Sequence, residues 1–242
     1  MIPKVIHYCW FGNSKPPRSI RRCIDSWKRV MPDYQIKCWD GNSFDFDSVP
    51  FVRDAMAAKK YAFAADYVRL YALYTEGGIY LDSDVFVKRP FDAFLQNRFF
   101  CGTEAFLIDN KVNYRMEAAI MGAGKDNPFL DECMSYYQQK EFVFDRSGTD
   151  IVMPAVISSI AKKYGYTKEN RLQLLGEITV YPTSFFTNTL HPDNSDAEGL
   201  YAIHQNAGSW IDYSDRGWLF RFCKKHDLMD FYHRIERKKE TQ

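Results

Sequence analysis

The 21 residues 64–84 read AADYVRLYALYTEGGIYLDSD. The first part of this stretch is apolar almost all round, which is typical of a buried helix. The double glycine at 77 and 78 is a signal for the end of that helix. Ile79 to Leu81 reads as a short buried strand that leads into Asp82-Ser83-Asp84. The stretch therefore predicts a buried helix over about 62–76 and a buried strand over 79–81 with two carboxylates at its end.

The two carboxylates suggest a cation site. Residues i and i+2 of an extended segment point to the same side, so Asp82 and Asp84 are expected to face one point. Two like charges that converge are costly unless a cation lies between them. Carboxylate oxygens suit hard ions such as Mg²⁺ or Mn²⁺. The alternative is a solvated turn, for which Asp-Ser-Asp is a common composition, but the buried strand and the double glycine favour a functional site.

An acid–base pair lies on the helix before this strand. Asp66 and Arg69 are three residues apart, so they share one helix face. The alternative is a surface ion pair, but the helix is expected to be buried. A buried carboxylate and guanidinium need partners, and a polar ligand such as a sugar would supply them.

A third candidate follows an apolar strand near the C-terminus, in His204-Gln205-Asn206-Ala207-Gly208-Ser209-Trp210. A neutral imidazole at a strand end is a candidate third metal ligand. Gly208 would allow the backbone to approach a phosphate closely. Taken alone, His204 also fits a structural histidine.

Composition and periodicity indicate the fold class. The chain has 242 residues, 46% apolar and 26% charged, with a net charge of +1, which is typical of a globular protein and does not indicate a nucleic-acid partner. Aromatic residues make up 17%, and most of the rings are expected to fill the core. The expected strands are 5–10, 35–39, 79–81, 99–103, 118–121, 178–181 and 200–204. The expected helices are 16–30, 51–59, 62–76, 128–139 and 151–164. This alternation predicts an α/β sheet covered by helices, with ligands bound beyond the carboxyl ends of its strands.

The cysteines and the chain ends bear on location. Six cysteines are scattered without a CxxC pair, no signal peptide is recognisable and no run of 18 apolar residues exists, so we expect reduced thiols and a cytoplasmic protein. Residues 1–215 are expected to form one domain and 216–242 a helical extension. The extension carries eight Lys/Arg against four acids, 8 − 4 = +4, interleaved with bulky apolar residues. That pattern suits the anionic inner face of a membrane, or else a helix docked on the domain with its basic residues solvated.

Two stretches resemble a known family. Residues 2–12, IPKVIHYCWFG, and the block 64–84 are similar to the family-32 glycosyltransferases, the enzymes with a sugar-binding region containing a DXD motif. The resemblance extends to initiating mannosyltransferases and capsular polysaccharide enzymes. It implies a GT-A fold, a nucleotide-binding mixed sheet flanked by helices. It also implies transfer of a hexose from a nucleotide-sugar, with retention of configuration and with Mn²⁺ or Mg²⁺ bound. A UDP-sugar is favoured over GDP-mannose as donor, and a glycan or lipid-linked saccharide is the expected acceptor.

The same resemblance implies roles for single residues. Trp10 would stack on the nucleobase, and Ala64 and Ala65 would border the nucleoside and the donor. Asp66 and Arg69 would hydrogen-bond the donor sugar. The remaining donor and metal contacts would come from Asp82, Ser83, Asp84, His204, Gly208, Ser209 and Trp210. Among these, Asp82, Asp84 and His204 would hold the metal, with Ser209 as the alternative to His204, and Trp210 would lie near the leaving phosphate. Asp66, Arg69 and Asp84 are the residues expected to be catalytic.

Three questions stay open at this point. Asp150 would contact the donor or the acceptor, or would cap the helix expected after it. A haloacid-dehalogenase-like phosphatase also ends an apolar strand in Asp-x-Asp, but the later acidic pair that such an enzyme needs is missing from the sequence. A non-catalytic carbohydrate-binding protein would explain the aromatic residues but would not need converging carboxylates beside a buried Asp–Arg pair.

Overall fold

The computed structural model of the chain describes residues 1–11, 15–108, 111–143, 151–188 and 199–206. The helices are α1 (Arg18–Val30), α2 (Pro50–Ala57), α3 (Tyr61–Glu76), α4 (Pro128–Gln138) and α5 (Met153–Ala161). The strands are β1 (Val5–Cys9), β2 (Gln35–Trp39), β3 (Gly78–Leu81), β4 (Val85–Val87), β5 (Phe99–Ile108), β6 (Lys111–Ala123), β7 (Gln173–Leu175), β8 (Ile178–Tyr181), β9 (Phe186–Asn188) and β10 (Ala202–His204). Short 3₁₀ turns span Phe46–Ser48, Asp92–Phe94 and Lys162–Tyr164.

Two sheets make up the framework. The larger one has seven strands in the order β2-β1-β3-β6-β5-β8-β7, with β2, β1 and β3 parallel and β6 antiparallel to both of its neighbours. The smaller one has the order β4-β10-β9. Because β4 begins only four residues after β3 ends, the chain passes from one sheet to the other at Asp82-Ser83-Asp84. The acidic motif therefore lies where the two sheets meet.

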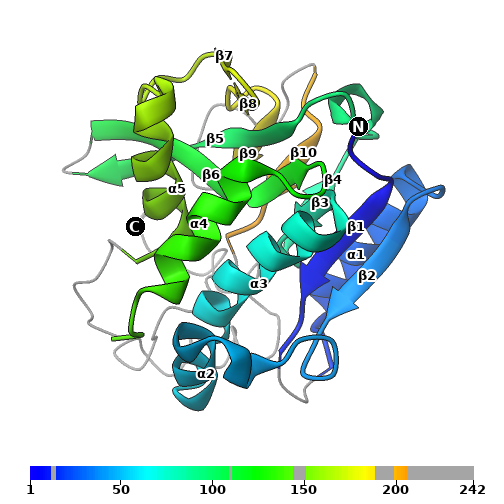
Figure 1. Cartoon of the computed structure of the whole chain (residues 1–242). Helices are drawn as coiled ribbons and strands as arrows, with labels where there is room; N and C mark the ends of the chain where they lie inside the picture. The colour runs from blue at the N-terminus through cyan, green and yellow to red at the C-terminus, as the bar shows by residue number, and fades with distance from the viewer. Residues whose placement is uncertain (12–14, 109–110, 144–150, 189–198, 207–242) are drawn as a thin grey trace, which may run out of the picture.

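Helices cover both faces of the larger sheet. Helices α2, α3, α4 and α5 pack on one face, and α1 packs on the other (Figure 1). Strand β3 is buried on both faces because its side chains alternate: Tyr80 enters the core under α3, whereas Ile79 and Leu81 enter the core shared with α1. The predicted α/β sheet covered by helices is confirmed.

Most predicted elements are present, with differences that have local causes. Strands β4, β7 and β9 have three residues each, too few to produce a readable alternation. The strands expected at 99–103 and 118–121 are parts of a much longer hairpin, β5–β6, whose outer half is polar or exposed. The helix expected at 151–164 is shorter: α5 begins at Met153, with Val152 as its N-cap and Pro154 in its first turn, where a missing N–H costs nothing.

The aromatic residues largely fill the core, as predicted. Phe94 lies at the centre of one cluster, with ring centroids 4.7 Å from Tyr201, 4.9 Å from Tyr181 and 5.0 Å from Phe186. These rings come from the loop after β4, from β8 and β9, and from the residue just before β10. The cluster therefore fixes the small sheet, and with it the end of β10, against the large one.

The double glycine makes a close contact with β1. Gly77 (φ +67°) ends α3, and Gly78 (φ +117°) starts β3. His7 is fully buried beneath them, accepts a hydrogen bond from Trp39 Nε1 (3.0 Å) on Nδ1 and donates from Nε2 to the Gly77 carbonyl (2.8 Å). Both ring nitrogens are therefore satisfied by a neutral imidazole, and burial lowers its pKa.

Gly78→Ala tests this contact. An added Cβ would lie 2.7 Å from the Val5 carbonyl oxygen and 2.9 Å from His7 Nε2, at a positive φ. We expect the free energy of unfolding in urea to fall by about 2–4 kcal/mol. Gly124→Ala is the matched control because its added Cβ would meet nothing nearer than 4.0 Å. Equal unfolding midpoints for the two variants would contradict the close contact.

Candidate active site

The acidic motif forms a turn directly after β3. The Asp82 N–H donates to the Ala119 carbonyl of β6 (2.8 Å), and the Val85 N–H donates back to the Asp82 carbonyl (2.9 Å). Residues 82–84 are thus a turn and not the extended segment that was expected from the sequence, because the chain changes sheets here. The turn still directs both carboxylates toward the end of β10.

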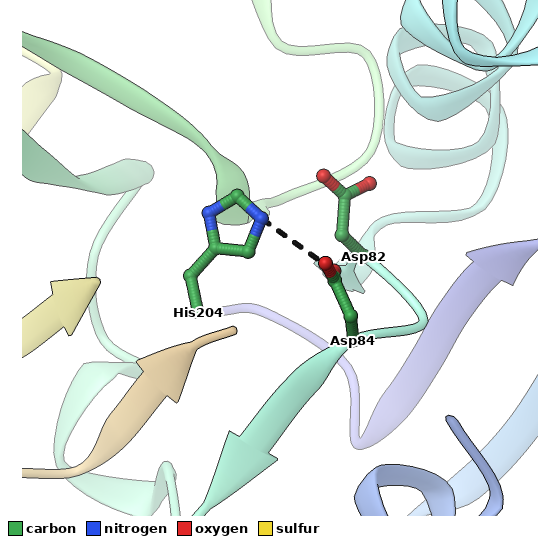
Figure 2. A group of neighbouring side chains, drawn as sticks. All are labelled: Asp82, Asp84 and His204. Atoms are coloured by element: carbon green, nitrogen blue, oxygen red, sulfur yellow. Dashed lines mark ion pairs between the residues drawn. The ribbon is translucent and has the colours of Figure 1, made fainter. Parts of the chain in front are cut away.

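His204 joins the two aspartates from a segment 120 residues later in the chain. One ligand atom from each of Asp82, Asp84 and His204 lies within 4.8 Å of the others, and the three side chains point toward one another (Figure 2). His204 Nε2 is 3.5 Å from Asp84 Oδ1. The antiparallel pairing of His204 with Val85 in the small sheet brings them together. Two carboxylates and an imidazole are a donor set that fits a divalent ion.

A fourth group, Glu117 on β6, stands behind His204. Its Oε1 lies 3.2 Å from His204 Nδ1. Burial alone would lower the pKa of His204, but the negative charges of Asp84 and Glu117 outweigh burial and raise it well above its usual range. The imidazole therefore lies between two carboxylates whose charges favour its protonated form, and a divalent ion at the Asp84 side would compete with the proton on Nε2.

Arg69 links the helix to the motif. Its Nη2 lies 2.9 Å from Asp66 Oδ1, its Nη1 lies 3.4 Å from Asp82 Oδ1, and Nη1 also donates to the Ala118 carbonyl (2.7 Å). Its guanidinium carbon lies 4.6 Å from the centre of the Tyr80 ring, and the Tyr80 hydroxyl donates to Asp82 Oδ1 (2.9 Å). The predicted burial of this pair on one helix face is confirmed. The guanidinium sets the position of the Asp82 carboxylate.

Burial shifts the pKa of Asp66. Desolvation raises the pKa of Asp66 to about 7, although Arg69 and the Met153 N–H (3.3 Å) favour the charged form. Burial disfavours the charge on Arg69 as well, but Asp82, Tyr80 and Asp66 together raise the pKa of the guanidinium. Arg69 thus keeps its charge, while Asp66 changes protonation near neutral pH.

A pocket of about 370 Å³ opens beyond the carboxyl ends of β1 and β2, and the acidic turn follows the carboxyl end of the neighbouring strand β3. Trp10 and Phe11 line it from the end of β1, and Asp40, Gly41, Asn42, Phe46, Met56 and Tyr61 complete the lining. Ala64 and Ala65 lie one turn further along α3 from Tyr61 and are buried. Trp10 thus occupies a pocket wall, as a ring that stacks on a ligand would.

Some functional candidates were missed in the sequence, and others lie outside the described residues. Glu117 is the one charge in the apolar run Met116–Ala123, a signal that could have been used. Asp40 and Asn42 follow the second strand as ordinary turn residues, without a distinguishing pattern. Ser83 lies in the turn, half-buried. Asp150, Gly208, Ser209 and Trp210 lie outside the described residues, as does the extension 216–242. The five cysteines within the described part are free thiols.

The family described as "Glycosyltransferase sugar-binding region containing DXD motif" matches residues 17–100, which include α3 and the Asp82-Ser83-Asp84 turn. Residues 17–100 are therefore similar to this DXD glycosyltransferase family, and the match covers about a third of the chain. The crystal structure of a glycosyltransferase involved in glycosylation of the major capsid of PBCV-1 has the same fold, with a TM-score of 0.51 and 13% identity over 86% of this chain and 95% of that one. The expected GT-A fold is confirmed.

Curated relatives agree with the family. Inositol phosphoceramide mannosyltransferase 3 of Schizosaccharomyces pombe is 33% identical over 53% of this chain, which spans only 35% of that protein's length. The uncharacterized glycosyltransferase L373 of Acanthamoeba polyphaga mimivirus is 24% identical, and the match covers 88% of this chain and 85% of the length of L373. Within the described residues of this DXD glycosyltransferase homologue, the helices are too short or too polar to cross a membrane.

The ionisation of Asp66 predicts a pH dependence of stability. Asp66 loses its proton near pH 4 in the unfolded chain but near pH 7 in the fold, so between these values the native state binds the extra proton. Its contribution to the free energy of unfolding therefore falls as pH rises through that window. Between pH 5 and 7.5 we expect the wild type to lose up to about 3 kcal/mol relative to Asp66→Asn, measured by urea unfolding of both proteins. Parallel pH profiles would contradict the raised pKa.

Proposed function

We propose that the chain is a retaining glycosyltransferase that moves a hexose from a nucleotide-sugar to a saccharide acceptor with a divalent ion bound. The observation that carries the proposal is the convergence of Asp82, Asp84 and His204 next to the buried Arg69–Asp66 pair. The aspartates and the histidine would bind the cation that the diphosphate of the donor needs, and the arginine–aspartate pair would bind the hydroxyls of the sugar. The DXD family match supports the same activity.

The donor would lie across the carboxyl ends of β2, β1 and β3 in the large sheet. Its nucleoside would occupy the pocket lined by Trp10, with the base stacked on the indole. Its sugar hydroxyls would meet Asp66 and Arg69, whose planar fork can donate two parallel hydrogen bonds. A UDP-hexose is the first candidate, and GDP-mannose is the second because one relative is named as a mannosyltransferase.

Asp82, Asp84 and His204 would hold the ion. The presence of an imidazole favours Mn²⁺ over Mg²⁺, which prefers oxygen ligands throughout. When bound, such an ion neutralises the charge that develops on the leaving diphosphate. Arg69 holds the Asp82 carboxylate in place by its 3.4 Å contact, and Asp66, when ionised, accepts a hydroxyl hydrogen of the donor. The buried setting strengthens each of these electrostatic contacts.

The acceptor we propose is a glycan or a lipid-linked saccharide. The name of the fungal relative refers to a ceramide lipid, which fits an acceptor at a membrane face. The basic and apolar composition of residues 216–242 supports contact with an anionic surface, and the chain would then act in polysaccharide or glycolipid synthesis on the cytoplasmic side.

Donor hydrolysis tests the activity directly. The full chain is incubated with Mn²⁺ and each of a panel of UDP- and GDP-sugars, and release of free sugar is followed. A transferase leaks sugar to water with its own donor, whereas a carbohydrate-binding protein does not. Release of phosphate from phosphomonoesters instead would support the phosphatase alternative.

Asp84→Ala tests the role of the motif. Removal of one charged ligand should lower the rate of donor hydrolysis by about 100-fold or more. Asp25→Ala, which removes an exposed carboxylate of α1, should leave the rate unchanged. Full activity of Asp84→Ala, or of the wild type in EDTA, would rule out the metal assignment.

Arg69→Lys tests the sugar contact. Lysine keeps the charge but not the planar fork, so we expect the affinity for the nucleotide-sugar to fall about tenfold, while the affinity for the bare nucleotide changes little. Calorimetric titration with both ligands measures the difference, and thermal unfolding checks that the variant folds. An equal loss for both ligands would assign Arg69 a purely structural role.

A further inference from the structure

One buried carboxylate has no part in the proposed transfer. Glu117 is only 3% exposed, on the central strand β6, and its Oε1 is 3.2 Å from His204 Nδ1. His204 turns its other nitrogen, Nε2, toward Asp84. The imidazole thus lies between Glu117 on one side and the proposed cation ligands on the other.

The Glu117 carboxylate is held in place. Its Oε1 also accepts a hydrogen bond from the Ala119 N–H (3.1 Å) of its own strand, and β6 is paired with β5 up to Met116 and with β3 from Ile120 onward. The two residues that follow Glu117 on β6 contact the rest of the site. The Ala118 carbonyl accepts a hydrogen bond from Arg69, and the Ala119 carbonyl accepts one from the Asp82 N–H. A shift of Glu117 would therefore require a shift of the strand that positions Asp82.

The chemistry of the pair determines where the hydrogens of His204 lie. An ionised carboxylate accepts hydrogen bonds but cannot donate them, so Nδ1 beside Glu117 must carry a hydrogen. Nδ1 is buried and makes no aligned hydrogen bond, and Glu117 Oε1 is an acceptor within reach of it. The lone pair that a cation needs is then available only at Nε2, on the side of Asp84.

A neighbouring ion pair supports the charge on Glu117. Arg115 Nε lies 2.6 Å from Glu104 Oε2, and these two residues face each other across β5 and β6. Residues 115 and 117 share a face of β6. Arg115 therefore offsets the negative charge of Glu104, the second buried carboxylate near His204. Glu104 serves as a matched control because it is buried, acidic and on the adjacent strand, but forms its ion pair with Arg115 and not with His204.

We propose that Glu117 is a positioning residue that holds His204 with its hydrogen on Nδ1 and with Nε2 directed at a divalent cation bound by Asp82 and Asp84. Carboxylates that accept from a metal-bound imidazole orient the ring and increase its basicity, and their loss typically costs about 10–100-fold in metal affinity. This inference rests on the metal-dependent function proposed above.

Mn²⁺ binding to the full chain tests the role, measured by titration with electron paramagnetic resonance detection. Glu117→Gln keeps the shape of the side chain, but its amide can also donate to Nδ1, which would place the hydrogen on Nε2 and block the cation. We expect Glu117→Gln to bind Mn²⁺ about 10–100-fold more weakly than the wild type, and Glu104→Gln to stay within about threefold.

Unfolding in urea is measured for both variants, so that a stability loss common to the two is separated from the metal effect. If Glu117→Gln does not fold, Glu117→Asp replaces it: the charge is kept but is withdrawn from Nδ1, and weaker Mn²⁺ binding is again expected. Unchanged Mn²⁺ affinity in a folded Glu117 variant would overturn the positioning role, as would equal losses in both glutamine variants. A wild-type chain without Mn²⁺ binding would instead overturn the metal-dependent function itself.

Discussion

The buried guanidinium of Arg69 is the contact on which the site depends. Its side chain is 5% exposed and joins three elements: α3 through Asp66, the end of β3 through Asp82, and β6 through the Ala118 carbonyl. A buried charge of this kind is stable only with all of its partners, and loss of one partner typically costs about 3–5 kcal/mol. The relative position of the helix, the sheet and the acidic turn is thus set by one side chain.

Strand β6 supplies the contacts that hold Arg69, Asp82 and His204. Three successive residues, 117–119, contact His204, Arg69 and Asp82 through one carboxylate and two carbonyls. Strand β6 is the central strand of the larger sheet, and residues 117–119 lie where its register with β5 shifts. The acidic turn is thereby held against the central strand of the sheet, and fixed groups are what charge stabilisation requires.

The small sheet supplies what the large one lacks. Strand β10 carries His204, and it is fixed to the domain by its pairing with β4 and by the ring of Tyr201 packed on Phe94. The aromatic richness of the chain therefore serves the site indirectly. The rings around Phe94 hold a three-residue strand that could not be stable alone.

Local sequence determined the elements around the motif. The apolar α3, its double-glycine end and the buried β3 were predicted because periodicity and glycine conformation act over a few residues. Helix spacing predicted that Asp66 and Arg69 share a face, whereas Asp82 and Asp84 converge through a turn and not through the expected strand spacing. The GT-A fold also followed from the resemblance that this stretch and residues 2–12 carry.

Tertiary structure alone decided the rest. The turn at 82–84 arises from a change of sheet, and the pairing of β10 with β4 that brings His204 to Asp84 joins residues 120 positions apart. Glu117 reads as one acid in an apolar strand until β6 is seen to cross behind His204. Strands of three residues have no readable period, and contacts between distant segments depend on the register of the whole sheet. For this reason His204 was a candidate ligand in the sequence, whereas its contact with Asp84 and the position of Glu117 behind it appeared only in the fold.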